Sequence, residues 1–400
     1  MKISINPIKI KEVLNRGVEN IYPSKEIFEG VLMSGKKLKI YNGIDPTGKL
    51  HIGHLVVLRK LRQLQELGHD IIVLFGGFTA SIGDPTGKDS TRKPLTRAQI
   101  VLNAKDYKEQ IKKFFGKEKL NIRFFDNEEW TNKLKPKDLL DLASNFTVAR
   151  LLERDMFQKR IKEGKDIHLN EFLYPIFQAY DSLTMDVDLE IGGSDQTFNM
   201  LAGRTLIKKL KNKEKFVLTT KLLTDSEGKK MGKTEGNMVN LDEPPGQMYG
   251  KIMSWPDGLI IQSLELCTDI PMDEIQKIES QIKEGKLNPK IAKERLAAEI
   301  VAICHSKTEA KEAAEEFNNV FKEKKLPSDI TEVKITQKTI NILDFLVAAK
   351  LVSSKAEAKR MVIQGGVKID GVVKKEWQGV VEIKKGLIVQ VGKRRFVKIA

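Results

Sequence analysis

The chain has 400 residues, of which 40% are hydrophobic and 31% charged, so it can form two or three domains and is not a disordered protein. Its net charge of +15 at pH 7 favours an anionic partner, although many basic proteins bind no anion. The two cysteines lack metal-ligand spacing, which excludes a disulfide framework and a zinc knuckle and indicates a reducing cytosol.

The first part of the chain, residues 1–16, alternates lysine with isoleucine and contains no continuous apolar stretch. No other run approaches the length that crosses a membrane. We therefore expect a cytoplasmic protein with no membrane partner.

A strand, loop, helix, strand pattern begins near residue 39. Residues 40–45 are strand-like, leucines at i+3 spacing mark a helix over 50–67, and residues 71–75 form an apolar strand. This βαβ unit predicts a parallel α/β sheet with its ligand site at the carboxyl ends of the strands.

A mostly helical stretch, residues 97–188, is expected to interrupt this sheet, which residues 189–193 resume as a strand ending in a glycine turn. We expect the regular part of its last helix to start at Pro175, since an interior proline would kink the helix. Residues 222–326 are helix-rich, and Pro327 opens a linker.

The tail after residue 338 has its own pattern. A helix is expected over 340–349, a capping box from Ser354 to Glu357 opens a second helix, and Asp370 and Gly371 form a hairpin turn. The tail therefore forms a small separate domain.

Two basic segments far apart in the chain predict a split triphosphate site. His51 and His54 are three residues apart at a helix start, where free N–H groups attract anions, and Gly53 between them lets a flat base pack on the backbone. The loop 229–234, Lys-Lys-Met-Gly-Lys-Thr, supplies mobile positive charge. The histidines alone would equally fit a solvated helix start.

These motifs resemble the class I aminoacyl-tRNA synthetases, in particular their bacterial tyrosyl branch. Residues 51–54 match the first class signature letter for letter. Residues 230–234 match the second, with Gly232 and Thr234 where serines are commonest and with both lysines kept. The resemblance covers nearly the whole chain.

The resemblance implies activation of L-tyrosine by ATP to tyrosyl-adenylate and pyrophosphate, followed by transfer of tyrosine to the 3′-terminal adenosine of tRNA(Tyr). Mg²⁺ would accompany ATP, and no metal or organic cofactor would be bound by the protein itself. It also implies a homodimer whose interface is formed by residues 97–188. Each tRNA would contact both subunits.

The same resemblance defines the domains. A Rossmann-like catalytic domain would occupy residues 1–221, with the helical insertion at about 97–188. A helical domain at 222–326 would carry the lysine loop and contact the anticodon stem of tRNA. After a linker at 327–337, an α+β RNA-binding domain of S4 type would occupy 338–400.

Two polar sets mark a candidate tyrosine pocket. Tyr41 lies on the first strand, and Tyr174, Gln178 and Asp181 lie at i, i+4 and i+7 on one helix face. Taken alone, the helix set fits an internally satisfied hydrogen-bond network. The resemblance implies that Tyr41 donates to the substrate's phenolic oxygen, Asp181 accepts from its hydroxyl, and Tyr174 and Gln178 contact the amino end.

Two glycine-containing segments are further candidates. Residues 83–88 are one residue too short for a phosphate loop, and the resemblance instead pairs Asp84 with the substrate ammonium. The turn after residue 191 is implied to bind adenosine through Gly193 and Asp195 and tyrosine through Gln196, whereas the alternative is an ordinary tight turn. We expect Glu190 to lie outside the site, because many bacterial relatives have glutamine there.

None of these motifs places an obvious nucleophile or general base. The tyrosine carboxylate can attack the α-phosphorus itself, so the enzyme need only align the reactants and stabilise charge on pyrophosphate. The residues expected to do so are His51, His54, Thr47, Lys230, Lys233 and Thr234. The residues expected to bind ATP are Gly43, Asp45, His51, Gly53, His54, Gly193, Asp195 and Lys233.

The tail carries about nine surplus positive charges, which suits an RNA partner but also fits a merely solvated appendage. The candidate RNA-binding residues are Lys355, Lys359, Arg360, Lys374, Lys375, Arg394 and Arg395.

Two rival interpretations remain. The tryptophanyl enzyme shares the fold, but Tyr41 and Asp181 together recognise a hydroxyl. A non-catalytic RNA-binding protein built on the synthetase scaffold is disfavoured by the intact histidines and lysines of the two signatures.

Overall fold

The computed structural model contains two compact units, Met1–Ala310 and Lys311–Ala400, which we describe separately. The structure describes residues 2–84, 95–116, 122–224, 238–322, 330–335, 337–392 and 395–400.

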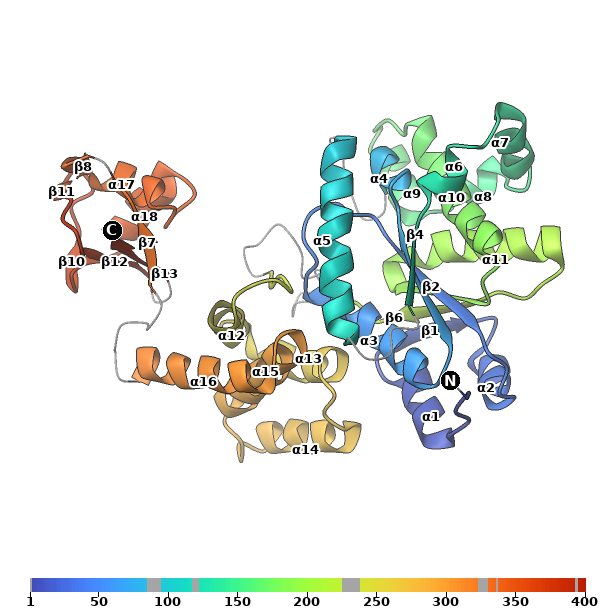
Figure 1. Ribbon diagram of the computed structural model, residues 1–400, viewed down its shortest axis with the longest axis horizontal. Helices are drawn as coiled ribbons and strands as arrows, with labels where there is room; N and C mark the ends of the chain where they lie inside the picture. The colour runs from blue at the N-terminus through green and yellow to red at the C-terminus, as the bar shows by residue number, and fades with distance from the viewer. Residues whose placement is uncertain are drawn as a thin grey trace. The chain divides into compact units, whose positions relative to one another are not determined.

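A six-stranded sheet forms the centre of the first unit (Figure 1). The strand order is β1-β6-β5-β2-β3-β4, and every neighbouring pair is parallel except β1 with β6. The strands are β1 (Val18–Tyr22), β2 (Lys39–Ile44), β3 (Asp70–Phe75), β4 (Ile122–Asp126), β5 (Leu189–Gly193) and β6 (Phe216–Thr220). The predicted parallel α/β sheet is therefore confirmed.

Helices cover both faces of this sheet. On one face, α3 (Ile52–Glu66) connects β2 to β3 and buries Leu58, Leu61 and Leu64 in the main core. On the other face, α10 (Leu169–Met185) and α11 (Thr197–Lys211) pack side by side (Figure 1). Tyr41 of β2 lies in the smaller core on that face, with Met185 and Ile207.

The remaining helices of the sheet region are short apart from α5. They are α1 (Pro7–Asn15), α2 (Lys25–Met33), α4 (Thr79–Ile82), α5 (Arg97–Phe115), α6 (Glu128–Thr131), α7 (Pro136–Ala143), α8 (Val148–Leu152) and α9 (Asp155–Lys162). One strand, β4, also falls inside residues 97–188, and it extends the sheet beside β3.

The expected start of α10 at Pro175 was wrong. The helix begins at Leu169, and its first turn is held by Glu171, whose carboxylate accepts from the main-chain N–H of His168 at 3.1 Å and from Arg160. Pro175 therefore lies in the helix interior. A buried ion pair outweighs the local preference of proline for a helix start.

A helical region completes the first unit. It consists of α12 (Pro245–Met253), α13 (Ile260–Cys267), α14 (Met272–Lys283) and α15 (Pro289–Cys304), and α16 (Lys307–Lys322) follows it. No helix among the described ranges is long and apolar enough to cross a bilayer.

The second unit is rich in strands. Its five-stranded sheet has the order β10-β9-β12-β13-β7, and β8 pairs with β11. The strands are β7 (Thr331–Val333), β8 (Thr339–Asn341), β9 (Val367–Ile369), β10 (Val372–Lys374), β11 (Val380–Glu382), β12 (Ile388–Val391) and β13 (Arg395–Ile399). Two helices, α17 (Ile342–Ala348) and α18 (Lys355–Ile363), contribute to the same core.

The hairpin prediction for this unit is confirmed, since the β9–β10 hairpin turns at Asp370 and Gly371. The capping box is found in part. Ser354 caps α18 by accepting from the N–H of Glu357 at 3.2 Å, but Glu357 accepts from the N–H of Ser353, at 2.8 Å.

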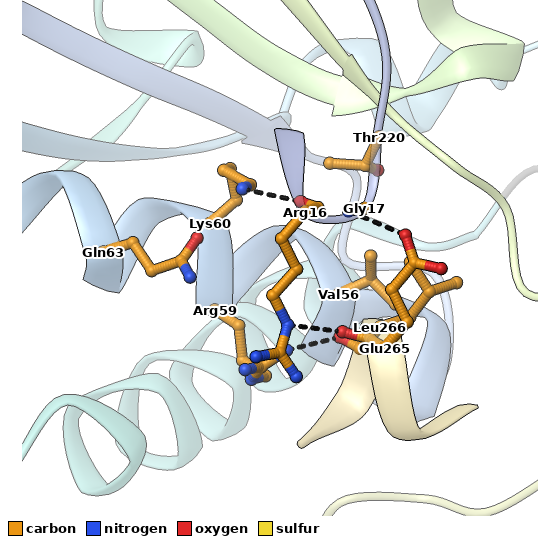
Figure 2. A pocket seen from close by; sticks show the side chains of 9 residues that line it. All are labelled: Arg16, Gly17, Val56, Arg59, Lys60, Gln63, Thr220, Glu265 and Leu266. Atoms are coloured by element: carbon orange, nitrogen blue, oxygen red, sulfur yellow. Dashed lines mark hydrogen bonds between the residues drawn. The ribbon is translucent and has the colours of Figure 1, made fainter. Parts of the chain in front are cut away.

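Two buried cations, Arg16 and Arg59, join α13 to the sheet region, and a third, Lys60, joins α3 to the end of α1 (Figure 2). Arg16 donates to four main-chain oxygens at the end of α13 and beyond it, those of Leu264, Glu265, Thr268 and Ile270, at 2.5–3.1 Å. Arg59 donates to Leu266 O at 2.7 Å, and Lys60 donates to Arg16 O at 2.9 Å. These carbonyls at the negative end of a helix are natural partners for cations.

We expect Arg16→Met to lower the free energy of unfolding by about 3 kcal/mol, because the buried carbonyls lose a charged donor. Urea unfolding followed by circular dichroism measures this change. The control is Lys9→Met on the exposed side of α1, which should change the midpoint little. Equal midpoints for the two variants would contradict the assigned role of Arg16.

Candidate active site

The candidate site lies at the carboxyl ends of β2, β3 and β5. Asp45 follows β2, and both of its carboxylate oxygens accept hydrogen bonds, from Thr79 Oγ1 at 2.8 Å and from the Tyr174 hydroxyl at 2.9 Å. Gly76 after β3 makes this possible, since a Cβ there would lie 2.0 Å from Asp45 Oδ1. Thr47 closes the turn with its N–H 2.7 Å from Asp45 O.

Asp181 is a buried carboxylate on the polar face of α10. Trp130 Nε1 donates to its Oδ1 at 2.7 Å, and Asn127 Nδ2 donates to its Oδ2 at 3.2 Å. Burial raises the pKa of Asp181 to about 8, although both hydrogen bonds lower it. Burial and nearby negative charges, including that of Asp181, also raise the pKa of Tyr41 well above its ordinary value.

Tyr41, Ser182 and Glu190 form a buried chain of polar side chains. The Tyr41 hydroxyl lies 2.7 Å from Ser182 Oγ, which lies 3.3 Å from Glu190 Oε2. Gln178 donates to Glu190 Oε1 at 2.9 Å, and Lys215 forms an ion pair with the same carboxylate. The structure thus places Glu190, which we expected outside the site, in direct contact with a predicted site residue.

Asp84 lies at another part of the site. Gln196 Nε2 donates to its Oδ2 at 2.7 Å, and Asn199 Nδ2 donates in turn to Gln196 Oε1 at 2.9 Å. The Arg154 guanidinium lies 4.0 Å from Asp84 Oδ1 and packs on the rings of Phe157 and Phe198. The structure therefore joins the predicted Asp84 and Gln196 in one network.

The two histidines form the start of α3. His51 Nδ1 accepts from the N–H of Gly53 at 3.2 Å, and His54 Nδ1 accepts from the N–H of His51 at 3.1 Å. The ring centroids lie 4.1 Å apart. Since both Nδ1 atoms accept, each neutral imidazole carries its proton on Nε2, the form that donates to anionic oxygens.

The lysine signature, with Lys230, Lys233 and Thr234, lies outside the described residues. The chain that follows it is tied to the histidine segment, because Ile52 N donates to Val239 O and Leu241 N donates to Leu50 O, both at 2.9 Å. Residues 239–241, which follow the second signature in the chain, therefore lie beside the start of α3.

The glycines of the site differ in their surroundings. A Cβ at Gly193 would lie 2.5 Å from Asp195 Oδ1, so that carboxylate lies directly over the backbone. A Cβ at Gly43 would meet only Tyr41 Cε2, at 3.9 Å. A Cβ at Gly53 would lie 3.0 Å from His51 Cε1, so the backbone there lies against the ring.

The predicted RNA-binding residues lie in the second unit. Arg360, Lys374 and Lys375 are exposed, whereas Arg394 falls outside the described residues. Three others already have protein partners: Lys355 pairs with Asp344 at 2.5 Å, Lys359 lies 3.9 Å from the Trp377 ring centroid, and Arg395 donates to Glu357 at 2.9 Å.

Four important residues were missed by sequence reasoning: Asn127, Trp130, Arg154 and Lys215. Trp130 carried a usable signal, since a tryptophan in a folded domain needs an acceptor for its N–H. Lys215 follows several exposed lysines at the end of α11, so the sequence suggested that it too lies on the surface.

Comparison with known proteins defines the class. A family model described as tRNA synthetases class I (W and Y) matches residues 33–322. A second model, described as the tyrosine–tRNA ligase SYY-like C-terminal domain, matches residues 322–399. The chain therefore belongs to the class I tRNA synthetases of the tryptophan and tyrosine group.

Full-length relatives narrow this assignment. The tyrosine–tRNA ligase of Thermotoga maritima is 43% identical over 99% of this chain and 98% of its own length. That of Carboxydothermus hydrogenoformans is 44% identical over 97% of each chain. Within its class, the chain belongs to the bacterial-type tyrosyl-tRNA synthetases.

Solved structures agree with this fold. A C-terminally truncated mitochondrial tyrosyl-tRNA synthetase of Aspergillus nidulans superposes with a TM-score of 0.64 at 25% identity, covering 78% of this chain and 94% of that chain. The Archaeoglobus fulgidus tyrosyl-tRNA synthetase complexed with L-tyrosine shares the fold, with a TM-score of 0.61 at 22% identity, covering 78% and 100%.

The raised pKa of Asp181 predicts a pH dependence of stability. The folded protein keeps a proton that the unfolded chain releases above pH 3.8, so the free energy of unfolding should fall as the pH rises toward about 8. The slope due to this group should reach about 1.4 kcal/mol per pH unit between the two values.

Urea unfolding at pH 5, 6, 7 and 8 measures this slope. Asp181→Asn should flatten it, and Asp141→Asn, on the exposed face of α7, should not. An unchanged slope in Asp181→Asn would show that Asp181 is ionised in the folded protein.

Proposed function

We propose that this chain activates L-tyrosine with ATP to tyrosyl-adenylate, releases pyrophosphate, and transfers tyrosine to the 3′-terminal adenosine of tRNA(Tyr). The observation that carries the proposal is the buried Asp181, which lies on the face of α10 that also carries Tyr174 and Gln178. Tyr41 of β2 is close enough for the charge of Asp181 to raise its pKa. A buried carboxylate and a buried hydroxyl suit a phenol, whose hydroxyl can both donate and accept, whereas the N–H of an indole can only donate.

ATP–pyrophosphate exchange with each amino acid tests this function. We expect exchange with L-tyrosine and none above background with L-tryptophan. Exchange with tryptophan alone would identify the other member of the class, and no exchange with either amino acid would support a non-catalytic RNA-binding protein.

Tyrosine would bind with its phenol toward Tyr41 and Asp181 and its ammonium toward Asp84, Tyr174, Gln178 and Gln196. Support comes from the hydrogen bonds that already order these groups, in particular Tyr174 to Asp45 and Gln196 to Asp84. Ordered acceptors cost less reorganisation when a ligand binds.

ATP would lie across the carboxyl ends of the strands. Its phosphates would face the Nε2–H groups of His51 and His54, with Asp45 and Thr47 beside them, and its base would lie on Gly53. The ribose would approach Gly43, Gly193 and Asp195. Mg²⁺ would arrive with ATP as part of the substrate.

The chemical step would need alignment and charge stabilisation only. The tyrosine carboxylate oxygen forms a bond to the α-phosphorus as the bond to pyrophosphate breaks, and the leaving group takes both electrons. The histidines donate to the phosphates, and Lys230, Lys233 and Thr234 stabilise the charge that develops on pyrophosphate.

A homodimer is also proposed, with the insertion at residues 97–188 at the interface. Support comes from large apolar side chains that the insertion exposes in the single chain, such as Leu140 at 70%, Val148 at 67% and Leu169 at 76%. Sedimentation equilibrium should return twice the chain mass, and the chain mass alone would refute the dimer. Its partners ATP and tRNA agree with a cytoplasmic location, as do its two free cysteines, of which Cys267 is buried and Cys304 is half-buried.

Lys233→Ala should slow adenylate formation by about 10²–10³ while leaving the affinity for tyrosine unchanged, because its charge acts mainly as pyrophosphate leaves. Stopped-flow fluorescence separates the rate from the binding. Lys277→Ala, at an exposed position on α14, is the control. A loss of tyrosine affinity without a loss of rate would contradict the role of Lys233.

The second unit should bind tRNA independently of the chemistry. A chain ending at residue 326 should keep tyrosine-dependent pyrophosphate exchange and lose most tRNA charging. The full-length variant Arg360→Ser/Lys374→Ser/Lys375→Ser should weaken tRNA binding and flatten its salt dependence, because fewer counterions are released. Undiminished charging by the shortened chain would contradict this assignment.

A further inference from the structure

Glu190 of β5 and Lys215, which directly precedes β6, form a buried ion pair next to Gln178. Glu190 is 1% exposed and Lys215 is fully buried. Lys215 Nζ also donates to Met200 O at 3.1 Å. Burial lowers the pKa of Lys215, and the Glu190 carboxylate opposes this shift. Because a buried pair gains little net stability over apolar packing, stability alone does not account for it.

The contact between Glu190 and Gln178 determines the orientation of an amide. Gln178 Nε2 lies 2.9 Å from Glu190 Oε1. A carboxylate only accepts hydrogen bonds, so the NH₂ group of Gln178 must face it. The carbonyl oxygen of Gln178 is thereby turned away from Glu190, as an acceptor. Lys215 forms an ion pair with the same carboxylate, so Glu190 lies between a cation on one side and the Gln178 amide donor on the other.

Gly203 provides independent support. It lies inside α11, where glycine costs about 1 kcal/mol relative to alanine. A Cβ at this position would lie 2.6 Å from Lys215 Nζ and 2.7 Å from Ser182 Oγ. Helix α11 thus approaches the network at a position that only glycine can occupy without displacing Lys215.

We propose that Glu190, held by Lys215, is a positioning residue for recognition of the substrate ammonium. It holds Gln178 with its carbonyl oxygen as an acceptor for that ammonium. The inference rests on the proposed function, in which Gln178 contacts the amino end of tyrosine. Glu190 contacts Gln178, at the ammonium end, directly at 2.9 Å and reaches Tyr41, at the phenol end, through Ser182.

The test uses the full-length protein and removes both charges together. Glu190→Met/Lys215→Met replaces the pair with unbranched apolar side chains, which leaves no unpaired buried charge. Glu190→Gln/Lys215→Met restores a neutral acceptor for Gln178. The control, Glu214→Gln/Arg204→Met, removes a partly exposed ion pair from the same end of α11. Thermal unfolding selects variants that fold like the wild type.

Three probes separate the two ends of the substrate. The dissociation constant of L-tyrosine is measured by equilibrium dialysis. Tyramine, which keeps the ammonium, and 3-(4-hydroxyphenyl)propionate, which lacks it, are measured by displacement. We expect the Met/Met variant to bind tyrosine and tyramine about tenfold more weakly and the propionate unchanged. The Gln/Met variant should recover part of the loss, and the control should match the wild type.

Gln178→Ala separates the role of Glu190 from the assignment of Gln178 to the substrate ammonium. If it weakens tyrosine and tyramine but the Met/Met variant does not, the positioning role of Glu190 is wrong and the pocket assignment stands. If Gln178→Ala leaves all three probes unchanged, the assignment of Gln178 to the ammonium is itself wrong. Equal weakening of all three probes in a folded Met/Met variant would show a purely structural role and overturn the inference.

Discussion

A carboxylate that is removed from water must receive hydrogen bonds or a cation, and this requirement organises the site. Asp45, Asp181 and Glu190 each meet it with donors from elsewhere in the chain. The donors to Asp181 follow β4, the cation of Glu190 precedes β6, and Thr79 of α4 bonds to Asp45. The site thus depends on the order of strands in the whole sheet, since the partners come from segments next to different strands.

The same requirement explains how the sheet region and the helical region are joined. The histidines belong to the sheet region, and the lysine loop is followed by the helical region. Arg16 and Arg59 bind the carbonyls at the end of α13, and Ile52 bonds to Val239 beside the histidines. These contacts join the two regions, so residues 239–241, which follow the lysine signature in the chain, lie beside the histidines.

Local patterns were sufficient for the elements with strong periodicity. The leucine spacing of α3, the apolar β3 and the cap of α18 all follow from interactions within a few residues. The resemblance supplied Asp181 and Asp84, whose roles no local pattern reveals. Where periodicity was weak, tertiary contacts determined the bounds and pairing of the elements. Helix α10 starts before Pro175, and β4 joins the edge of the sheet.

The partners of the buried carboxylates could not be predicted from the sequence. Asn127 and Trp130 lie about fifty positions from Asp181, and Lys215 lies 25 positions from Glu190. Such pairs form only after the sheet is assembled, so neither spacing nor composition indicates them. The position of Glu190 could not be predicted for this reason, because its partner Lys215 looked in the sequence like one of several surface lysines.

The central claim is that this paired, dry pocket recognises a phenol hydroxyl. Measuring kcat/KM for tyrosine and for phenylalanine in ATP–pyrophosphate exchange tests it most directly. The account predicts a preference for tyrosine of about 10⁵, the discrimination known for enzymes of this type, because phenylalanine has no hydroxyl to bond to Asp181 and Tyr41. A preference of tenfold or less would contradict it.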